Sequence, residues 1–105
     1  MEFKPELIDS RLEDLIPGYL KNILDNFEKL KELYLEKNYS EMKKNCHKVL
    51  GTAVSYGFFQ LDTLISQLQG NLHSLDLSEI EMDMKNLNDY FIFIRSEYKN
   101  LIGPD

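Results

Sequence analysis

Apolar residues recur at three- and four-residue steps through most of this chain, the spacing that places them on one face of an α-helix. The longest regular run, from Tyr19 to Tyr34, predicts an amphipathic helix of roughly five turns, and Pro17 suits its first turn. Residues 12–16 form a short apolar cluster, which predicts a short N-terminal helix that ends at Pro17 and Gly18. The apolar positions of the long run are Tyr19, Leu20, Ile23, Leu24, Phe27, Leu30, Leu33 and Tyr34.

The pattern breaks at residues 37–40 and then resumes, which predicts a second helix. Asn38 or Ser40 can cap its N-terminus, because both side chains accept a hydrogen bond from a first-turn N–H group. Gly57 suits a left-handed stop at its C-terminus. Its apolar positions step by four, three, four and three residues, as in a core seam, and are Met42, Cys46, Val49, Ala53 and Tyr56.

Two further helices are predicted in the second half of the chain. The third fades between His73 and Asp76, and the last begins near Ser78, a plausible N-cap, and ends at Gly103-Pro104. The inward positions of the third helix are Leu61, Leu64, Ile65, Leu68 and Leu72. Those of the last helix are Ile80, Met84, Leu87, Tyr90, Phe91, Ile94, Tyr98 and Leu101.

Short connections between long helices force sequential neighbours to run in opposite directions. The pattern therefore predicts an all-α fold, an antiparallel up-down four-helix bundle with a short N-terminal helix. A chain of 105 residues is long enough for one modest core, so residues 1–105 are expected to form a single domain. The low content of glycine and proline agrees with this prediction.

Charge is unevenly distributed along the chain. The formal net charge is -6, which argues against nucleic-acid binding because clustered Lys and Arg supply most of the affinity for phosphate backbones. Residues 40–57 carry three basic side chains and one acidic side chain, whereas both flanking regions are net negative. The second predicted helix is thus the only net positive part of the chain.

The cysteine content and the apolar runs bear on the cellular compartment. Cys46 is the only cysteine, so no intramolecular disulfide can form and a reducing compartment is expected. Residues 1–5 lack the basic and apolar parts of a secretory signal, and the run from Tyr90 to Ile94 is too short to span a bilayer. These features predict a cytoplasmic protein that does not associate with membranes.

His47 is the residue most suggestive of chemistry. It directly follows the seam position Cys46, so it is expected at the surface, on a stripe with Lys43, Leu50 and Val54. Gly51 lies one helical turn after it. A glycine inside a helix costs about 0.5–1 kcal/mol relative to alanine, and its position beside the histidine indicates that a large group must approach the ring.

These residues resemble a known family. Residues 47–58, which read HKVLGTAVSYGF, resemble the signature of histidine-containing phosphotransfer (HPt) domains, a histidine followed by glycine, small residues and a second glycine. Residues 15–20 resemble the entry to the first long helix in one branch of the family, and Leu61, Leu64 and Leu68 match apolar positions after the second glycine. The resemblance covers residues 12–72, and the last helix fits by pattern only.

The resemblance implies a four-helix bundle that shuttles phosphoryl groups in a two-component phosphorelay, with His47 as the phosphoacceptor through Nε2. Such a protein is a phosphoryl carrier without catalytic activity of its own and needs no intrinsic cofactor. The implied partners are response-regulator receiver domains, which supply Mg²⁺, and a hybrid histidine kinase is a further candidate. A monomer is expected.

Three lysines are expected to face the phosphoryl group or an acidic partner, namely Lys43, Lys44 and Lys48. Gly51 is expected to leave room for the partner's loops. The alternative for Lys43 and Lys44 is an ordinary solvated face.

Leu50 departs from the family pattern. The family usually has lysine three residues after the histidine, where it contacts the phosphoryl group, and leucine cannot do this. With Val54 and either Phe58 or Phe59, Leu50 would instead form an apolar strip that docks a partner helix. This departure leaves open a second function, a phosphorylation-deficient adaptor or inhibitor that binds receiver domains or sensor kinases.

Several of these residues also have simpler interpretations. A lone histidine on a helix is often only structural or solvated, and His73 is expected to be so. Cys46 and His47 are adjacent and do not share a helical face, so they do not suit a thiol nucleophile with its base, and Cys46 is expected in the core. The spacing of the two histidines does not suggest a metal site. A kinase-like dimerisation bundle is a more distant alternative.

Overall fold

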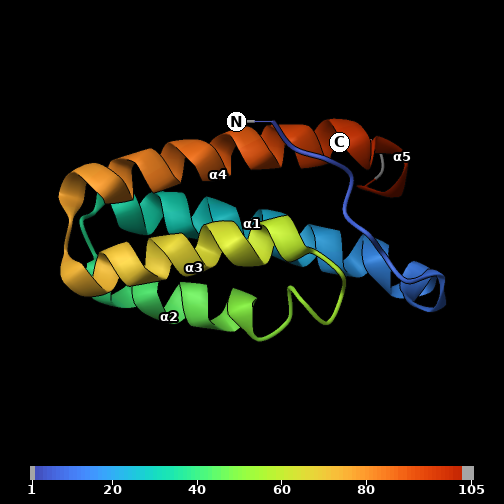
Figure 1. Cartoon of the computed structure of the whole chain (residues 1–105), viewed down its shortest axis with the longest axis horizontal. Helices are drawn as coiled ribbons and strands as arrows, with labels where there is room; N and C mark the ends of the chain where they lie inside the picture. The colour runs from blue at the N-terminus through green and yellow to red at the C-terminus, as the bar shows by residue number, and fades with distance from the viewer. Residues whose placement is uncertain (1, 103–105) are drawn as a thin grey trace.

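The computed structural model describes residues 2–102, and within them the chain is helical without any β-strand, as predicted. The four longer helices lie side by side around one core, and consecutive helices run in opposite directions (Figure 1). The elements are the 3₁₀ helix η1 (Ser10–Leu15) and the α-helices α1 (Ile16–Leu35), α2 (Tyr39–Leu50), α3 (Phe59–Ser74), α4 (Leu77–Glu97) and α5 (Lys99–Ile102).

The core is one cluster of apolar side chains contributed by α1 to α4 and by the α2–α3 connection. Every inward position predicted for the third helix is buried. The stacked rings of Phe27 and Phe91, 4.5 Å apart, join α1 to α4. Burial of a side chain of this size contributes about 1.5–3 kcal/mol, so this cluster is the main source of stability. Its largest fully buried members are Tyr90, Phe58, Ile16, Leu20, Leu30, Met42, Leu61, Ile65, Leu68, Leu72, Ile80 and Leu87.

The helix starts follow the expected chemistry with one correction. Pro17 lies in the first turn of α1, and the Asn38 side chain caps α2 by accepting a hydrogen bond from the N–H of Glu41 at 3.3 Å. The prediction that Ser78 caps the last helix is wrong. Asp76 is the N-cap of α4, and the Ser78 hydroxyl donates to its carboxylate at 3.2 Å.

The second helix is shorter than predicted. It ends at Leu50, and residues 51–57 form a series of hydrogen-bonded turns instead of continuing the helix to Tyr56. Glycine and β-branched residues disfavour helix, and the Thr52 hydroxyl donates to the Val49 carbonyl at 3.2 Å.

Gly57 is confirmed as the left-handed stop of this segment, with φ of 87°. The N–H of Phe58 donates to the Ala53 carbonyl at 2.8 Å, and the N–H of Gly57 donates to the Val54 carbonyl at 3.0 Å. These two bonds form a Schellman motif, which satisfies carbonyl groups left open at the end of the turns.

The last helix also ends earlier than predicted. α4 stops at Glu97, and Tyr98, with φ of -109° and ψ of 27°, separates it from the short α5. The Tyr98 hydroxyl accepts a hydrogen bond from the backbone N–H of Glu6 at 2.9 Å, so this side chain serves the N-terminal segment. The predicted stop at Gly103-Pro104 lies outside the described residues.

Glu6 anchors the N-terminal segment by capping α3. The residue before α3, Phe58, offers no side-chain cap, and the Glu6 carboxylate takes this role by accepting from the N–H groups of Gln60 at 3.2 Å and Leu61 at 3.3 Å. Only 8% of Glu6 is exposed. The Tyr90 hydroxyl, whose pKa is raised by burial, keeps its proton and donates to the same carboxylate at 2.7 Å.

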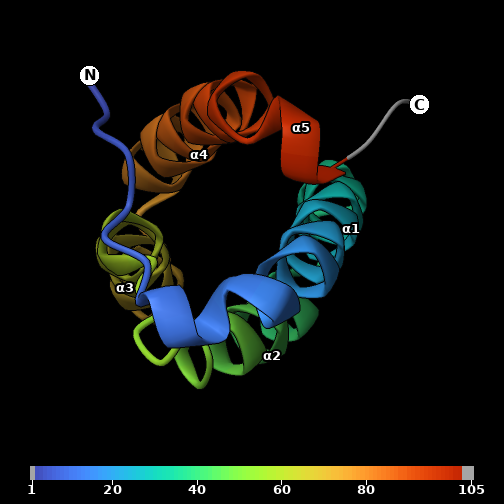
Figure 2. The same cartoon turned by 90° about the vertical axis from the view of Figure 1, so that its right-hand side faces the viewer.

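Residues 2–9 are here named the N-terminal strap, and they make further contacts on either side of Glu6. The backbone of Lys4 exchanges two hydrogen bonds with the Gln60 side chain, and the Phe3 ring packs edge-on against Tyr90 with centroids 5.3 Å apart. Figure 2 shows the strap passing beside α4 and α3, and η1 crossing the end of the helices toward α1. The strap is therefore held against α3 and α4.

None of the helices within residues 2–102 combines the length and the apolar content that a membrane-spanning helix needs.

Replacing Glu6 tests the anchor. Glu6→Gln keeps the size of the side chain but turns a donor toward Tyr90 and the N-terminus of α3, so we expect the free energy of unfolding to fall by about 2–3 kcal/mol. Urea denaturation measures it. The matched control is Glu13→Gln on η1, an exposed glutamate, with an expected change below about 0.5 kcal/mol. Equal effects of the two variants would contradict the anchor.

Two glycine-to-alanine changes should act in opposite directions. At Gly57 an added Cβ would lie 2.6 Å from the Leu7 carbonyl oxygen, and the positive φ disfavours alanine, so Gly57→Ala should destabilise by about 2 kcal/mol or more. Gly70 lies inside α3 with nothing within 4 Å of an added Cβ, so Gly70→Ala should stabilise by about 0.5–1 kcal/mol. Thermal unfolding by circular dichroism measures both, and shifts of the same sign would refute the assignment.

Candidate functional site

The buried face of α2 turns His47 outward. Asn45, 5% exposed, accepts a hydrogen bond from the Asn26 side-chain amide at 2.7 Å and donates to the Asn26 backbone carbonyl at 3.4 Å, which holds α2 against α1. Because His47 lies on the opposite side of the helix, its ring is exposed to solvent. The other buried residues of this face are Met42, Cys46 and Val49.

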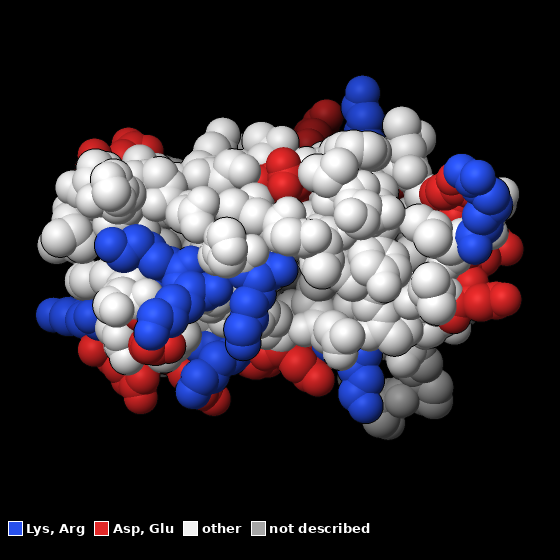
Figure 3. Space-filling view, turned by 90° about the horizontal axis from the view of Figure 1, so that it is seen from below, with Lys and Arg blue, Asp and Glu red and all other residues white. Residues whose placement is uncertain are grey.

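The three lysines of α2 differ in their surroundings. Lys44 forms an exposed ion pair with Glu41 at 3.2 Å, an interaction that contributes little to stability. Lys43 is half-buried and Lys48 is exposed, and among residues 2–102 neither pairs with a carboxylate. Figure 3 views the molecule from the α2 side and shows basic side chains gathered on one half of this face, beside a largely uncharged half.

The prediction that Gly51 lies inside the helix is wrong, because α2 ends at Leu50 and Gly51 is its C-cap residue. Gly51 still leaves the surface beside His47 open. It is exposed, and an added Cβ would meet only the backbone carbonyls of Lys48 at 3.5 Å and His47 at 3.7 Å, at ordinary contact distance. No side chain therefore stands on this position, and another molecule has access to the helix one turn beyond the ring.

The predicted apolar strip is only partly present. Leu50 is half-buried and packs against the core, while Val54 and Phe59 are about half exposed, at 47% and 50%. Phe58 is fully buried and cannot belong to a surface strip. Val54 lies in the turns after α2 and not on the helix, because α2 ends at Leu50.

Lys43 and Lys48 line two separate recesses, one on each side of α2. Lys48 lines a recess of about 210 Å³ against α1, and Lys43 lines one of about 410 Å³ against α3, together with Gly70 and His73. His47 lines neither recess. His73 is exposed in the last turn of α3, as expected. That it shares a recess with Lys43 was not predicted, because the two residues lie on different helices.

The recess against α1 contains residues that sequence reasoning missed. Asn22 and Asn26 lie four residues apart on α1, on either side of the buried Ile23, and this amide pair was a usable signal. Thr52 and Tyr56 reach the recess only because the chain leaves the helix after Leu50, which the apolar pattern did not predict.

Cys46 belongs to the core, as predicted. It is fully buried, and burial raises the pKa of its thiol to about 12. A protonated, inaccessible thiol is a poor nucleophile, so the adjacent histidine has no thiolate partner here.

Within residues 2–102, no group of three or more His, Cys, Asp or Glu side chains is placed to hold an ion.

The state of Cys46 can be tested with iodoacetamide. At pH 8 a thiol with a pKa of about 12 is roughly a thousandfold less ionised than an ordinary cysteine, and burial also blocks the reagent, so native alkylation should be at least about a thousandfold slower than in 8 M urea. Mass spectrometry over time measures the modified fraction. Complete native labelling within minutes would contradict the burial of this thiol.

Comparisons with known proteins provide no match from which a function could be transferred. The chain matches no protein-family model, no curated protein and no solved structure. The properties available for assigning a function are therefore the exposed histidine, the lysines around it and the open position at Gly51.

Proposed function

We propose that this protein is a histidine phosphotransfer protein of a two-component phosphorelay. His47 accepts a phosphoryl group from an aspartate of one receiver domain and passes it to another. The observation that carries the proposal is the position of His47, exposed on the outer face of α2 while the opposite face is fixed in the core.

The surroundings of His47 support this role. A receiver domain must bring its own phosphoaspartate into line with the imidazole, so a convex and accessible histidine suits transfer between proteins better than a buried one. The open position at Gly51 admits the receiver's loops. Lys43 and Lys48, free of carboxylate partners within residues 2–102, attract an acidic partner and lower the cost of a phosphoryl charge on His47.

The proposed step is a direct substitution at phosphorus. The lone pair of His47 Nε2 attacks the phosphorus atom, the N–P bond forms, and the P–O bond to the donor carboxylate breaks. The aspartate leaves as a carboxylate, and the second transfer reverses these events on another receiver. Mg²⁺, supplied with the acidic pocket of the receiver, neutralises phosphoryl charge during the transfer.

The proposal extends to the fold and the cellular context. The helix order and directions suit an antiparallel up-down four-helix bundle of HPt type, a single domain over residues 1–105 that acts as a monomer in the cytoplasm. It carries phosphoryl groups without catalytic activity of its own. Its partners are response-regulator receiver domains and, as a further candidate, a hybrid histidine kinase. The core formed within one chain supports a monomer over a dimerisation bundle.

Leu50 favours one second candidate, a phosphorylation-deficient adaptor or inhibitor that binds receiver domains or sensor kinases. Leu50 replaces the lysine expected beside the phosphoryl group, and Val54 exposes an apolar side chain beyond it. Lys48 can supply positive charge, but it points about 100° away from His47 around the helix. The adaptor would use this surface for binding and would not need the imidazole.

Phosphotransfer from a panel of phosphorylated receiver domains in the presence of Mg²⁺ tests the proposal. We expect acid-labile, base-stable labelling of the wild type and a loss of at least about a hundredfold in His47→Gln, because the nucleophile is removed. His73→Gln is the matched control and should keep full labelling, since His73 is also exposed but lies on α3.

Binding measurements separate the two candidates. For a relay, His47→Gln should still bind the receiver with its fold intact. Absence of labelling by any receiver that binds, together with loss of binding in Val54→Glu, would overturn the relay and establish the adaptor. Equal loss of labelling in His47→Gln and His73→Gln would also contradict the assignment of His47.

A further inference from the structure

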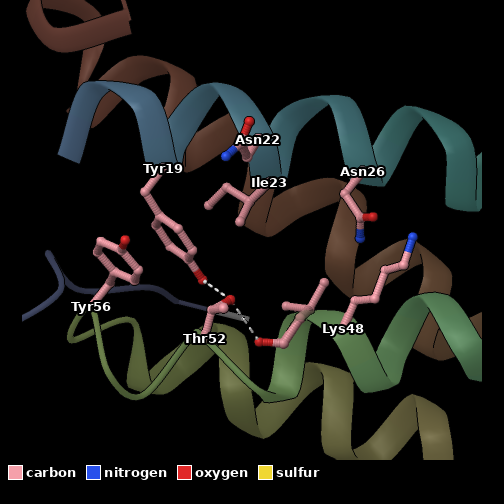
Figure 4. Close-up of a pocket in the computed structure, with 8 residues that line it drawn as sticks. Tyr19, Asn22, Ile23, Asn26, Lys48, Thr52 and Tyr56 are labelled. Carbon is pink, nitrogen blue, oxygen red and sulfur yellow. Dashed lines mark hydrogen bonds between the residues drawn. The ribbon is translucent and has the colours of Figure 1, made fainter. Parts of the chain in front are cut away.

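A recess between α1 and α2 is lined by both polar and apolar side chains (Figure 4). Its volume is about 210 Å³, compared with about 150 Å³ for an engineered cavity that holds benzene. It is therefore large enough for one small ring and a polar group. Its lining consists of Tyr19, Asn22, Ile23, Asn26, Lys48, Val49, Thr52 and Tyr56.

Several polar groups of the recess remain available to a ligand. Among residues 2–102, the side chains of Asn22, Lys48 and Tyr56 form no hydrogen bond with another residue. Asn26 donates to Asn45, which leaves its side-chain carbonyl without a donor from these residues. Lys48 extends from α2 toward Asn26 on α1, so its ammonium group stands on the rim of the recess (Figure 4).

One end of the recess is formed by side chains that contact one another. Tyr19 and Tyr56 stack with ring centroids 4.1 Å apart and planes inclined by 9°, and the hydroxyl oxygens of Tyr19 and Thr52 are 3.3 Å apart. The Thr52 hydroxyl also contacts the Val49 carbonyl at 3.2 Å. These contacts order the wall before any ligand arrives, which lowers the entropic cost of binding.

The charge of the recess indicates which class of ligand it can bind. The chain has 18 acidic residues, yet none of them lines this recess, and Lys48 is its one charged group. Ile23 and Val49, both largely buried, form a small apolar floor. A single ammonium group beside neutral donors and an apolar floor matches a monoanion with an apolar body, whereas a phosphate dianion would need more positive charge.

We propose that this recess binds small organic monocarboxylates. The carboxylate accepts a hydrogen bond from the Lys48 ammonium at the rim, and the apolar body lies over Ile23 and Val49. The small volume and the exposure of Lys48 set the affinity in the millimolar range. This binding needs no chemistry at His47, although it shares Lys48 with the surface proposed for phosphotransfer.

Benzoate is the probe, and benzamide is its neutral counterpart of equal size. The full chain, labelled with ¹⁵N, is titrated with each compound by NMR at constant ionic strength. We expect saturable shifts with benzoate at the backbone amides of residues 22–26 and 48–56, and weaker binding of benzamide by about fivefold or more. Inorganic phosphate should bind more weakly than benzoate.

Substitutions test whether Lys48 is the charged group that binds benzoate. Lys48→Gln should weaken benzoate binding by about fivefold, while Lys44→Gln, an exposed lysine of the same helix outside the recess, should leave it unchanged. His47→Gln should also bind as the wild type does, whether or not the protein carries phosphoryl groups. Linear shifts without saturation, equal binding of benzamide, tighter binding of phosphate, or equal loss in Lys44→Gln would each overturn the proposal.

Discussion

The buried carboxylate of Glu6 is the contact on which one end of the molecule depends. It accepts hydrogen bonds from the first N–H groups of α3 and from the hydroxyl of Tyr90 on α4. A residue far from both helices in the sequence thus joins α3 to α4. A carboxylate is suited to this place because the N-terminus of a helix carries partial positive charge and open donors. The burial of Glu6 is tolerable only because its oxygens are satisfied.

This anchor reaches the region after His47 through backbone contact. The strap that Glu6 holds brings the Leu7 carbonyl against Gly57, where no side chain fits. Gly57 in turn ends the turns of residues 51–57, which carry Thr52 and Tyr56 to the recess beside α1. The N-terminal strap, the α2–α3 connection and the wall of the recess therefore form one connected structure.

The outer face of α2 combines rigidity with access. The hydrogen bonds between Asn45 and Asn26 fix the rotation of the helix, since an amide buried without them would cost free energy. His47 is then exposed on the outer side of the helix, with Lys44 and Lys48 also exposed and Lys43 half-buried. Lys43 and Lys48 diverge to opposite sides of the helix, so a partner that contacts both must cover its full width.

The sequence by itself determined the all-α class, the apolar faces, the buried Cys46, the exposure of His47 and the stop at Gly57, because these follow from helical period and from local backbone chemistry. Only the tertiary structure decided that Glu6 is buried, that α2 ends at Leu50, that Phe58 joins the core and that Asn22, Lys48 and Tyr56 line one recess. The reason is physical: each of these depends on contacts between residues far apart in the chain. A charged residue near a terminus or a residue between helices carries no periodic signal of such a contact.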